Sequence, residues 1–201
     1  MESLGVNFYQ TEEDKLRQAV EGSVFSGKTI LFTGTLETLG RKEAQELAEK
    51  AITQLLLLDY ESQEPITVYV CSPGGHVDSG FAIYDIMKFI HSPVTTIGVG
   101  WVASIAVPIM MGAPKERRLA LPNTRFLIHQ PSGGAGGQAA DIRIEAQEIL
   151  KIRERINRLL SLETGHPIEK IAKDSDRNFW MSAEEALEYG LIGEIISKRK
   201  V

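Results

Sequence analysis

The feature that most constrains this fold is a regular alternation of short apolar runs with longer amphipathic segments. Short runs rich in β-branched residues predict buried strands, while apolar residues spaced three and four apart predict helices. We predict strands at residues 29–33, 66–70, 94–99, 125–128 and 191–196, and helices at 11–20, 39–58, 79–90, 104–111, 139–162, 168–173 and 182–188. Strands that alternate with helices in this way indicate an α/β fold with mostly parallel strand pairing.

The length and one long helix refine this prediction. The chain has 201 residues, enough for one domain with a substantial core and too few for two ordinary domains. The predicted helix at 139–162 has about 24 residues and would be roughly 36 Å long. A domain of this size does not need such a helix for its own core. We therefore expect it to project or to pack against a partner.

Charge and cysteine content exclude several classes of function. The net charge of −5 and the isoelectric point near 5.5 give no basic surface for nucleic acid or an anionic membrane. A single cysteine, Cys71, can form neither an internal disulfide nor a cysteine-based zinc site. The first residues lack the apolar core of a signal peptide, and the apolar run at 97–112 is too short and interrupted to span a membrane. We expect a cytoplasmic protein without metal or cofactor.

Two glycine-rich segments imitate nucleotide-binding motifs. Residues 22–29, Gly-Ser-Val-Phe-Ser-Gly-Lys-Thr, match the pattern of a phosphate-binding loop. That chemistry requires a strand before the loop and a helix after it, whereas here the charged helix precedes and a strand follows. The run at 133–137 follows a strand but lacks an acidic residue about 20 positions later at the end of a second strand. We interpret the first as a turn and the second as a loop or a strand edge that binds substrate.

Three further segments carry residues suited to nucleophilic catalysis. The segment Cys71-Ser-Pro-Gly-Gly75-His-Val77 ends a predicted strand in a turn with two glycines, whose backbone N–H groups a ligand can approach. Ser104 lies at the start of a predicted helix, and His129 lies at the end of a predicted strand. Taken singly, the serine would be a helix cap and the histidine a structural residue. Together they supply a nucleophile and a base.

The order and spacing of these segments resemble the Clp protease proteolytic subunit family, ClpP. The similarity covers roughly residues 29–197 and rests on several motifs in register. The motifs are Ser-Pro-Gly-Gly-x-Val, Gly-x-x-Ala-Ser, Leu-Pro-Asn-x-Arg-x-x-Ile-His-Gln-Pro, Gly-Gly-x-x-Gly-Gln-Ala-x-Asp-Ile, Glu-Ile-Leu-Lys-Ile, Asp-x-Asp-Arg and Ser-Ala-x-Glu-Ala-x-x-Tyr-Gly-Leu-Ile.

The resemblance implies a serine peptidase with the crotonase-like spiral of ββα units, in one domain over residues 29–201. Such subunits form stacked heptameric rings, and an AAA+ ATPase delivers unfolded protein to them. By position, Ser104 would be the nucleophile and His129 the general base, with oxyanion-hole N–H groups from Gly75 and Ile105. The helix at 139–162 would be the handle between rings, and the Asp176-Arg177 pair would join them; two solvated charges are the alternative for that pair.

The chain also departs from the family pattern. Asn178 stands where the family has the third triad residue, an aspartate; Asp174 and Asp176 are alternative partners for His129. The nucleophile segment is bulkier, with Val102 for alanine, Ile105 for methionine and Ala106 for glycine. Residues 1–28 do not match the family's axial region, so ATPase docking is the least supported implication.

Three functions remain in competition after this comparison of motifs. The first is a serine endopeptidase of a Clp complex in protein quality control. The second is an attenuated or structural ring subunit that modulates an active ClpP paralogue; Asn178 and Ile105 favour it, while the retention of Ser104 and His129 argues against an inactive subunit. The third is an acyl-CoA enzyme of the crotonase superfamily, which needs no Ser-His pair.

Overall fold

The fold is a mixed α/β arrangement, as the alternating sequence predicts. A computed structural model describes residues 28–36, 41–134 and 136–198. The helix predicted at 11–20 and the phosphate-loop match at 22–27 therefore lie outside the described residues. So does most of the segment at 1–28, which leaves the predicted domain boundary at residue 29 a prediction.

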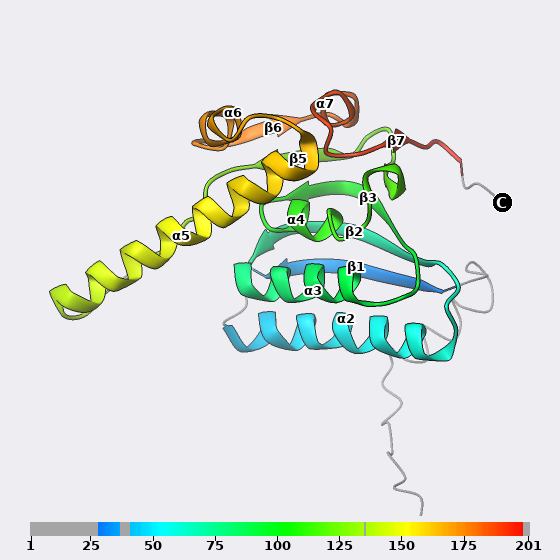
Figure 1. Cartoon of the computed structure of the whole chain (residues 1–201), viewed down its shortest axis with the longest axis horizontal. Coiled ribbons are helices and arrows are strands. Elements are labelled where there is room, and N and C mark those ends of the chain that lie inside the picture. Colours follow the sequence, from blue (N-terminus) through cyan, green and yellow to red (C-terminus); the bar gives the residue numbers. More distant parts are fainter. Residues whose placement is uncertain (1–27, 37–40, 135, 199–201) are drawn as a thin grey trace, which may run out of the picture.

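A mostly parallel sheet forms the centre of the molecule (Figure 1). Its main path runs through β1 (Thr29–Leu36), β2 (Ile66–Gly75), β3 (Val94–Ala103), β4 (Arg118–Ala120) and β7 (Glu194–Ile195). Off this path, β5 (Arg125–Ile128) pairs with β3 in parallel, and β6 (Phe179–Met181) pairs with β5 in antiparallel orientation. The β5–β6 pair is thus the antiparallel element among the described strands.

An irregularity in β3 splits the sheet. The pairing of Val70 with Gly98 is followed by that of Ser72 with Val102, so β3 carries extra residues opposite β2. Gly100 lies in this bulge with a φ of 66°, a conformation that favours glycine. Before the bulge, β3 pairs with β4, and after it with β5. The bulge thereby directs the C-terminal end of β3 toward the strand that precedes His129.

Helices cover the sheet and bury its apolar side chains. Helices α2 (Arg41–Glu61) and α3 (Val77–Phe89) run side by side along one side of the sheet (Figure 1). The buried face of α2 consists of residues spaced four, three and four apart, Ala44, Ala48, Ala51 and Leu55. The short helix α4 (Ala106–Met110) is buried throughout and packs against β2 and β3.

Helix α5 (Ala139–Thr164) projects from the body of the protein (Figure 1). Its 26 residues give a length of about 39 Å. All of its buried residues, Ile156, Asn157 and Leu160, lie in the C-terminal half. The N-terminal half exposes Ile142, Ile144 and Leu150. The structure therefore confirms the prediction that this helix extends beyond the core of its own domain.

A buried arginine holds the C-terminal end of α5 in place. Arg118, at the start of β4 after η1 (Lys115–Arg117), is 1% exposed. Its Nε donates to the carbonyl of Ala113 at 2.8 Å, and an Nη atom forms an ion pair with Glu163 of α5. Glu163 also lies 3.5 Å from the amine of Lys88 on α3.

The last part of the chain is built from short elements. Helix α6 (Ile168–Asp174) is followed by β6 and by α7 (Ala183–Tyr189), which begins at a full capping box formed by Ser182 and Glu185. The predicted strand at 191–196 is limited to the two residues of β7.

The structure corrects two sequence predictions here and adds two strands that the sequence does not predict. The turn predicted at residues 73–75 is instead the end of β2, which accommodates the glycines through a bulge and positive φ angles. The helix predicted at 104–111 is shorter, so that Ser104 precedes α4 by two residues. The strands β4 and β6 were missed, because three residues are too few to show a hydrophobic period.

The described part of the phosphate-loop match does not resemble a phosphate site. Lys28 donates hydrogen bonds to the carbonyls of Leu58 and Ser62, at the end of α2, and β1 begins at the next residue. A strand therefore follows the match directly, which is the order that argues against nucleotide binding. Across the described ranges, no helix is long and apolar enough to cross a membrane.

Candidate functional site

Ser104 lies in a strained turn between β3 and α4. Its φ is 57°, the one positive value among the described non-glycine residues. Its N–H donates to the carbonyl of Leu127 on β5 at 2.9 Å, so the pairing of β3 with β5 extends to this residue. Backbone strain of this kind costs on the order of 1–3 kcal/mol and concentrates at functional sites. The side chain is half-buried and emerges where the two strands end.

The glycine end of β2 packs directly against this turn. A Cβ atom added to Gly74 would lie 2.6 Å from the Cβ of Ser104 and 3.1 Å from the backbone nitrogen of Ile105. Glycine is therefore required there by close approach, in addition to its φ of 96°. Gly75, the next residue, has a φ of 130°. The predicted oxyanion-hole residues Gly75 and Ile105 are thus brought to one place.

The amide of Ile105 is available to a ligand. Among the described residues it donates no hydrogen bond, although the carbonyl of Ile105 accepts one from Ile109. The Ile105 side chain is 1% exposed. Helix α4 has five residues, too few for a substantial helix dipole, so a ligand here would rely on the N–H itself.

His129 and Asn178 lie beside the last residue pair of β5 and β6. In the antiparallel β5–β6 pair, Phe126 faces Met181, Leu127 faces Trp180 and Ile128 faces Phe179. His129 follows Ile128 and Asn178 precedes Phe179, so both residues flank the last pair of this register. The ends of β3 and β5 and the start of β6 therefore bring together Ser104, His129 and Asn178.

The three side chains are not yet hydrogen-bonded to one another. Within the described part of the chain, no hydrogen bond joins the side chains of Ser104, His129 and Asn178. His129 is half-buried and Asn178 is exposed. Catalytic hydrogen bonds are often long or misaligned in a free enzyme and tighten when substrate binds.

Asp174, one of the two alternative partners for His129, has other partners. Its carboxylate accepts a hydrogen bond from the Tyr189 hydroxyl at 2.7 Å and one from the Lys170 amine at 2.5 Å. Burial pushes the pKa of Asp174 upward, but the hydrogen bonds from Lys170 and Tyr189 outweigh it and hold the pKa below its ordinary value. Burial, and next the Asp174 carboxylate, raise the pKa of Tyr189. This network binds α6 to α7.

Asp176, the other alternative, points toward α5. Its carboxylate lies 3.1 Å from the guanidinium of Arg153, and its carbonyl accepts a hydrogen bond from Gln130 at 2.8 Å. Arg177, its neighbour in the predicted contact between rings, is exposed. In a single chain Asp176 is therefore paired within the subunit, with the helix that projects from it.

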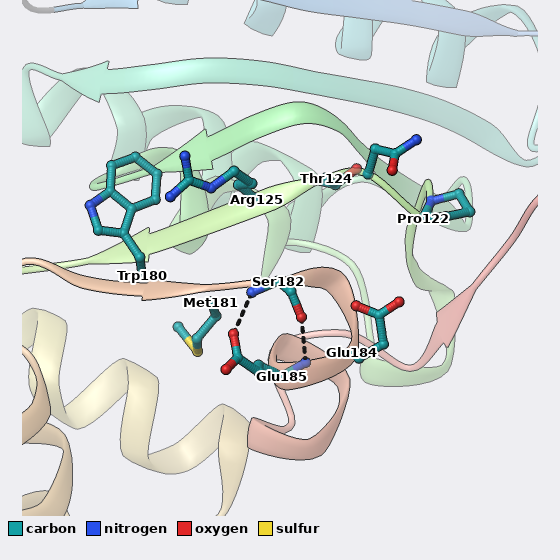
Figure 2. Close-up of a pocket in the computed structure, with 9 residues that line it drawn as sticks. Pro122, Thr124, Arg125, Trp180, Met181, Ser182, Glu184 and Glu185 are labelled. Atoms are coloured by element: carbon teal, nitrogen blue, oxygen red, sulfur yellow. Dashed lines mark hydrogen bonds between the residues drawn. The ribbon is translucent and has the colours of Figure 1, made fainter.

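An aromatic cluster lies on the sheet face that carries Arg125. Side chains alternate along a strand, so Arg125 and Leu127 of β5 share one face. Trp101 of β3 pairs with Arg125, and the rings of Trp101 and Trp180 stack at 6.5 Å with 7° between their planes. The Arg125 guanidinium extends over the Trp180 ring at 4.4 Å (Figure 2). No local pattern in the sequence indicates this cluster, because its members are far apart in the chain.

A cavity of about 490 Å³ lies at the N-terminal end of β5 (Figure 2). None of the predicted site residues lines it; the lining consists of Pro122, Asn123, Thr124, Arg125, Trp180, Met181, Ser182, Glu184 and Glu185. Among the described residues, no group of three or more histidine, cysteine, aspartate or glutamate side chains could hold a metal ion.

The fold and the strand ends define an α/β protein with a serine and a histidine at adjoining strands. Comparison with known proteins gives the family. The Clp protease family model matches residues 25–199. The chain is 50% identical over 190 residues to the ATP-dependent Clp protease proteolytic subunit 3 of Rhizobium etli, covering 94% of both chains. It is also 50% identical over 193 residues to proteolytic subunit 2 of Treponema denticola, covering 95% of both.

A solved structure agrees with these sequence comparisons. A ClpP1 mutant from Listeria monocytogenes, in which an asparagine is replaced by aspartate, has a TM-score of 0.79 and 46% identity, covering 92% of this chain and 97% of that one. The protein therefore belongs to the Clp protease family, a family of serine peptidases.

Proposed function

We propose that this chain is the serine endopeptidase subunit of a Clp complex and that Ser104 and His129 carry the chemistry. The observation that supports this most is the register of three strands. Ser104 extends the β3–β5 pairing, and His129 and Asn178 flank the last pair of β5 and β6. A nucleophile, a base and an orienting group need this adjacency.

The reaction follows from these groups. The Oγ of Ser104 attacks the carbonyl carbon of a peptide bond while its proton passes to a ring nitrogen of His129. The carbonyl oxygen becomes an oxyanion and accepts hydrogen bonds from the N–H groups of Gly75 and Ile105. The imidazolium then gives its proton to the departing amine, which leaves an acyl group on Ser104. Water, deprotonated by His129, hydrolyses this ester and restores both side chains.

Asn178 orients His129 in this proposal. The amide oxygen of an asparagine can accept the second ring N–H of the histidine and so present a lone pair to Ser104. An amide carries no charge to stabilise the imidazolium, and a flipped amide would favour the wrong tautomer. The third group of this site is therefore weaker than an aspartate would be.

The remaining parts of the proposal come from the family. Residues 29–201 form the peptidase domain of a cytoplasmic protein, which assembles into stacked heptameric rings. Helix α5 is the handle between rings, and Asp176 and Arg177 contribute to the same contact. An AAA+ ATPase, which docks near the divergent segment 1–28, delivers unfolded protein. The Rhizobium etli and Treponema denticola relatives carry the numbers 3 and 2, which is consistent with pairing between ClpP paralogues.

A second candidate is an attenuated ring subunit that modulates an active paralogue. The exposed Asn178, without a side-chain hydrogen bond to the described residues, and the buried Ile105 favour it. A subunit of this kind would assemble normally and hydrolyse peptides slowly by itself.

Labelling with a serine-reactive probe tests the proposal. A fluorophosphonate or β-lactone should modify Ser104, as shown by intact mass and peptide mapping, and Ser104→Ala should abolish both labelling and hydrolysis of a fluorogenic peptide. Labelling that persists in Ser104→Ala would refute the nucleophile assignment. Mixing the protein with a ClpP paralogue from the same source distinguishes the two candidates, since the attenuated subunit gains activity only in the mixture.

A further inference from the structure

The helix that follows the glycine segment is capped by a histidine. His76, directly after Gly75, is the N-cap residue of α3, with φ −63° and ψ 115°. Its Nδ1 accepts the backbone N–H of Ser79 at 3.3 Å and lies 2.9 Å from the Ser79 hydroxyl. The His76 carbonyl accepts the N–H of Gly80 at 3.2 Å, the first hydrogen bond of the helix. Serine, threonine, aspartate and asparagine are the preferred residues at an N-cap.

The cap implies a definite state of the imidazole. Nδ1 accepts the Ser79 N–H only with a lone pair, so the ring is neutral with its proton on Nε2. A positive charge at this place would also oppose the positive end of the helix. Ser79 itself is 5% exposed, so its N–H has little access to water as an alternative partner.

The first turn of α3 contacts both proposed oxyanion-hole residues. His76 is covalently joined to Gly75, which supplies one N–H. On the other side, a Cβ atom added to Gly80 would lie 2.2 Å from the Cγ1 of Ile105, so the helix backbone packs directly on that side chain. Ile105 supplies the other N–H. The first turn thus connects the two donors mechanically.

We propose that His76 is a positioning residue of the oxyanion hole: as a neutral imidazole cap, it fixes the first turn of α3 and thereby the relative position of the Gly75 and Ile105 amides. This inference rests on the proposed function of those amides. His76 itself touches neither the reacting carbonyl nor Ser104 in this role. Its effect appears in the transition state, because an oxyanion requires donors within about 2.7–3.1 Å, whereas substrate binding depends on many other contacts.

Three variants separate positioning from general stability. His76→Ala removes the cap, His76→Asn restores a side-chain acceptor at the N-cap, and Ser182→Ala removes the corresponding cap of α7, outside the proposed site. Steady-state hydrolysis of a fluorogenic peptide gives kcat and KM, and analytical ultracentrifugation checks that particle size is unchanged. Amide hydrogen exchange by mass spectrometry, at peptides covering residues 75–80, follows the first turn independently of activity.

We expect His76→Ala to lower kcat about ten-fold with little change in KM, less than the roughly hundred-fold loss for removal of an entire oxyanion donor. His76→Asn should retain at least half of the parent kcat, and Ser182→Ala should leave kcat within about two-fold. Hydrogen exchange at residues 75–80 should accelerate in His76→Ala alone.

Other results would overturn the inference. A kcat within about two-fold of the parent in His76→Ala, or a His76→Asn variant as slow as His76→Ala, would show that the cap does not position the donors. If the parent and Ser104→Ala were equally inactive, the proposed function would fail. The hydrogen-exchange experiment would still test the role of His76, because unchanged exchange at residues 75–80 in His76→Ala would show that the cap does not fix the first turn of α3.

Discussion

The ion pair between Arg118 and Glu163 provides a test of how α5 is attached to the body of the protein. Arg118 is 1% exposed, and the side chain of Glu163 is 15% exposed. Breaking a buried ion pair costs about 3–5 kcal/mol when the charge left behind stays buried. We expect Glu163→Ala to lower the free energy of unfolding by about 3 kcal/mol, the lower end of that range, because Arg118 keeps its bond to Ala113 and its partner was partly solvated.

The opposite substitution should have a smaller effect. Arg118→Met fills the buried space with an apolar side chain and leaves Glu163 near solvent and near Lys88 at 3.5 Å. We expect a loss of about 1–2 kcal/mol, typical of a polar group deprived of one partner. The double variant Glu163→Leu with Arg118→Met should lie within about 1 kcal/mol of the parent, since replacement of a whole buried pair is often neutral.

Urea unfolding at pH 7 and one fixed protein concentration gives the free energy of unfolding of all three variants. The order of the two single variants is the decisive result. If Arg118→Met were more destabilising than Glu163→Ala, the charge of Arg118 would not be the buried partner, and the attachment of α5 described above would be wrong.

Three further predictions concern the proposed site and the assembly. Asn178→Asp should raise peptide hydrolysis about ten-fold, or about 1.4 kcal/mol, in a particle of unchanged size; equal or lower activity would contradict the role of the amide. Arg177→Ala should shift the assembly toward single rings in analytical ultracentrifugation, and an intact double ring would show that this arginine is not part of the contact. Asp174→Asn should retain kcat within about two-fold, because its carboxylate binds Tyr189 and Lys170, and a larger loss would make Asp174 the orienting group. The pKa of Asp174 is lowered in the folded state, so the stabilisation that its carboxylate provides is complete above the ordinary pKa of 3.8 and is lost as the pH falls through the folded pKa. The free energies of unfolding of the parent and of Asp174→Asn should therefore differ at pH 7 and converge in acid.

Much of the architecture could be predicted from hydrophobic periodicity. The helix predicted at 139–162 is α5 with two more residues at its end, and the strand predicted at 125–128 matches β5. Short strands could not be predicted in this way. The three residues of β6 contain no full period, and their pairing with β5 depends on contacts between segments about 50 positions apart. His129 and Asn178 flank the last pair of that register, so the sequence could suggest that they lie close together only through the resemblance to a family.

The residues around the proposed nucleophile show a second reason why local sequence patterns do not predict the whole structure. Local propensity favours a turn at Pro73-Gly-Gly, yet β2 continues to Gly75 because the tertiary structure brings its backbone against Ser104. The positive φ of Ser104 is likewise unfavourable for the isolated segment. The chain departs from local preference at the point where the proposed oxyanion donors meet, and a period-based prediction cannot see a conformation imposed by neighbouring strands.

The location of residue 178 has an evolutionary consequence. It precedes a three-residue strand, its side chain is exposed, and this side chain makes no hydrogen bond to another described residue. Exchanges at such a surface position usually change stability by less than about 0.5 kcal/mol. After a gene duplication, one copy could therefore gain or lose a carboxylate at this position and change its turnover by an order of magnitude, while selection on the sheet and on α5 continued unchanged. A single codon would then set the rate of peptide hydrolysis of one copy relative to the other.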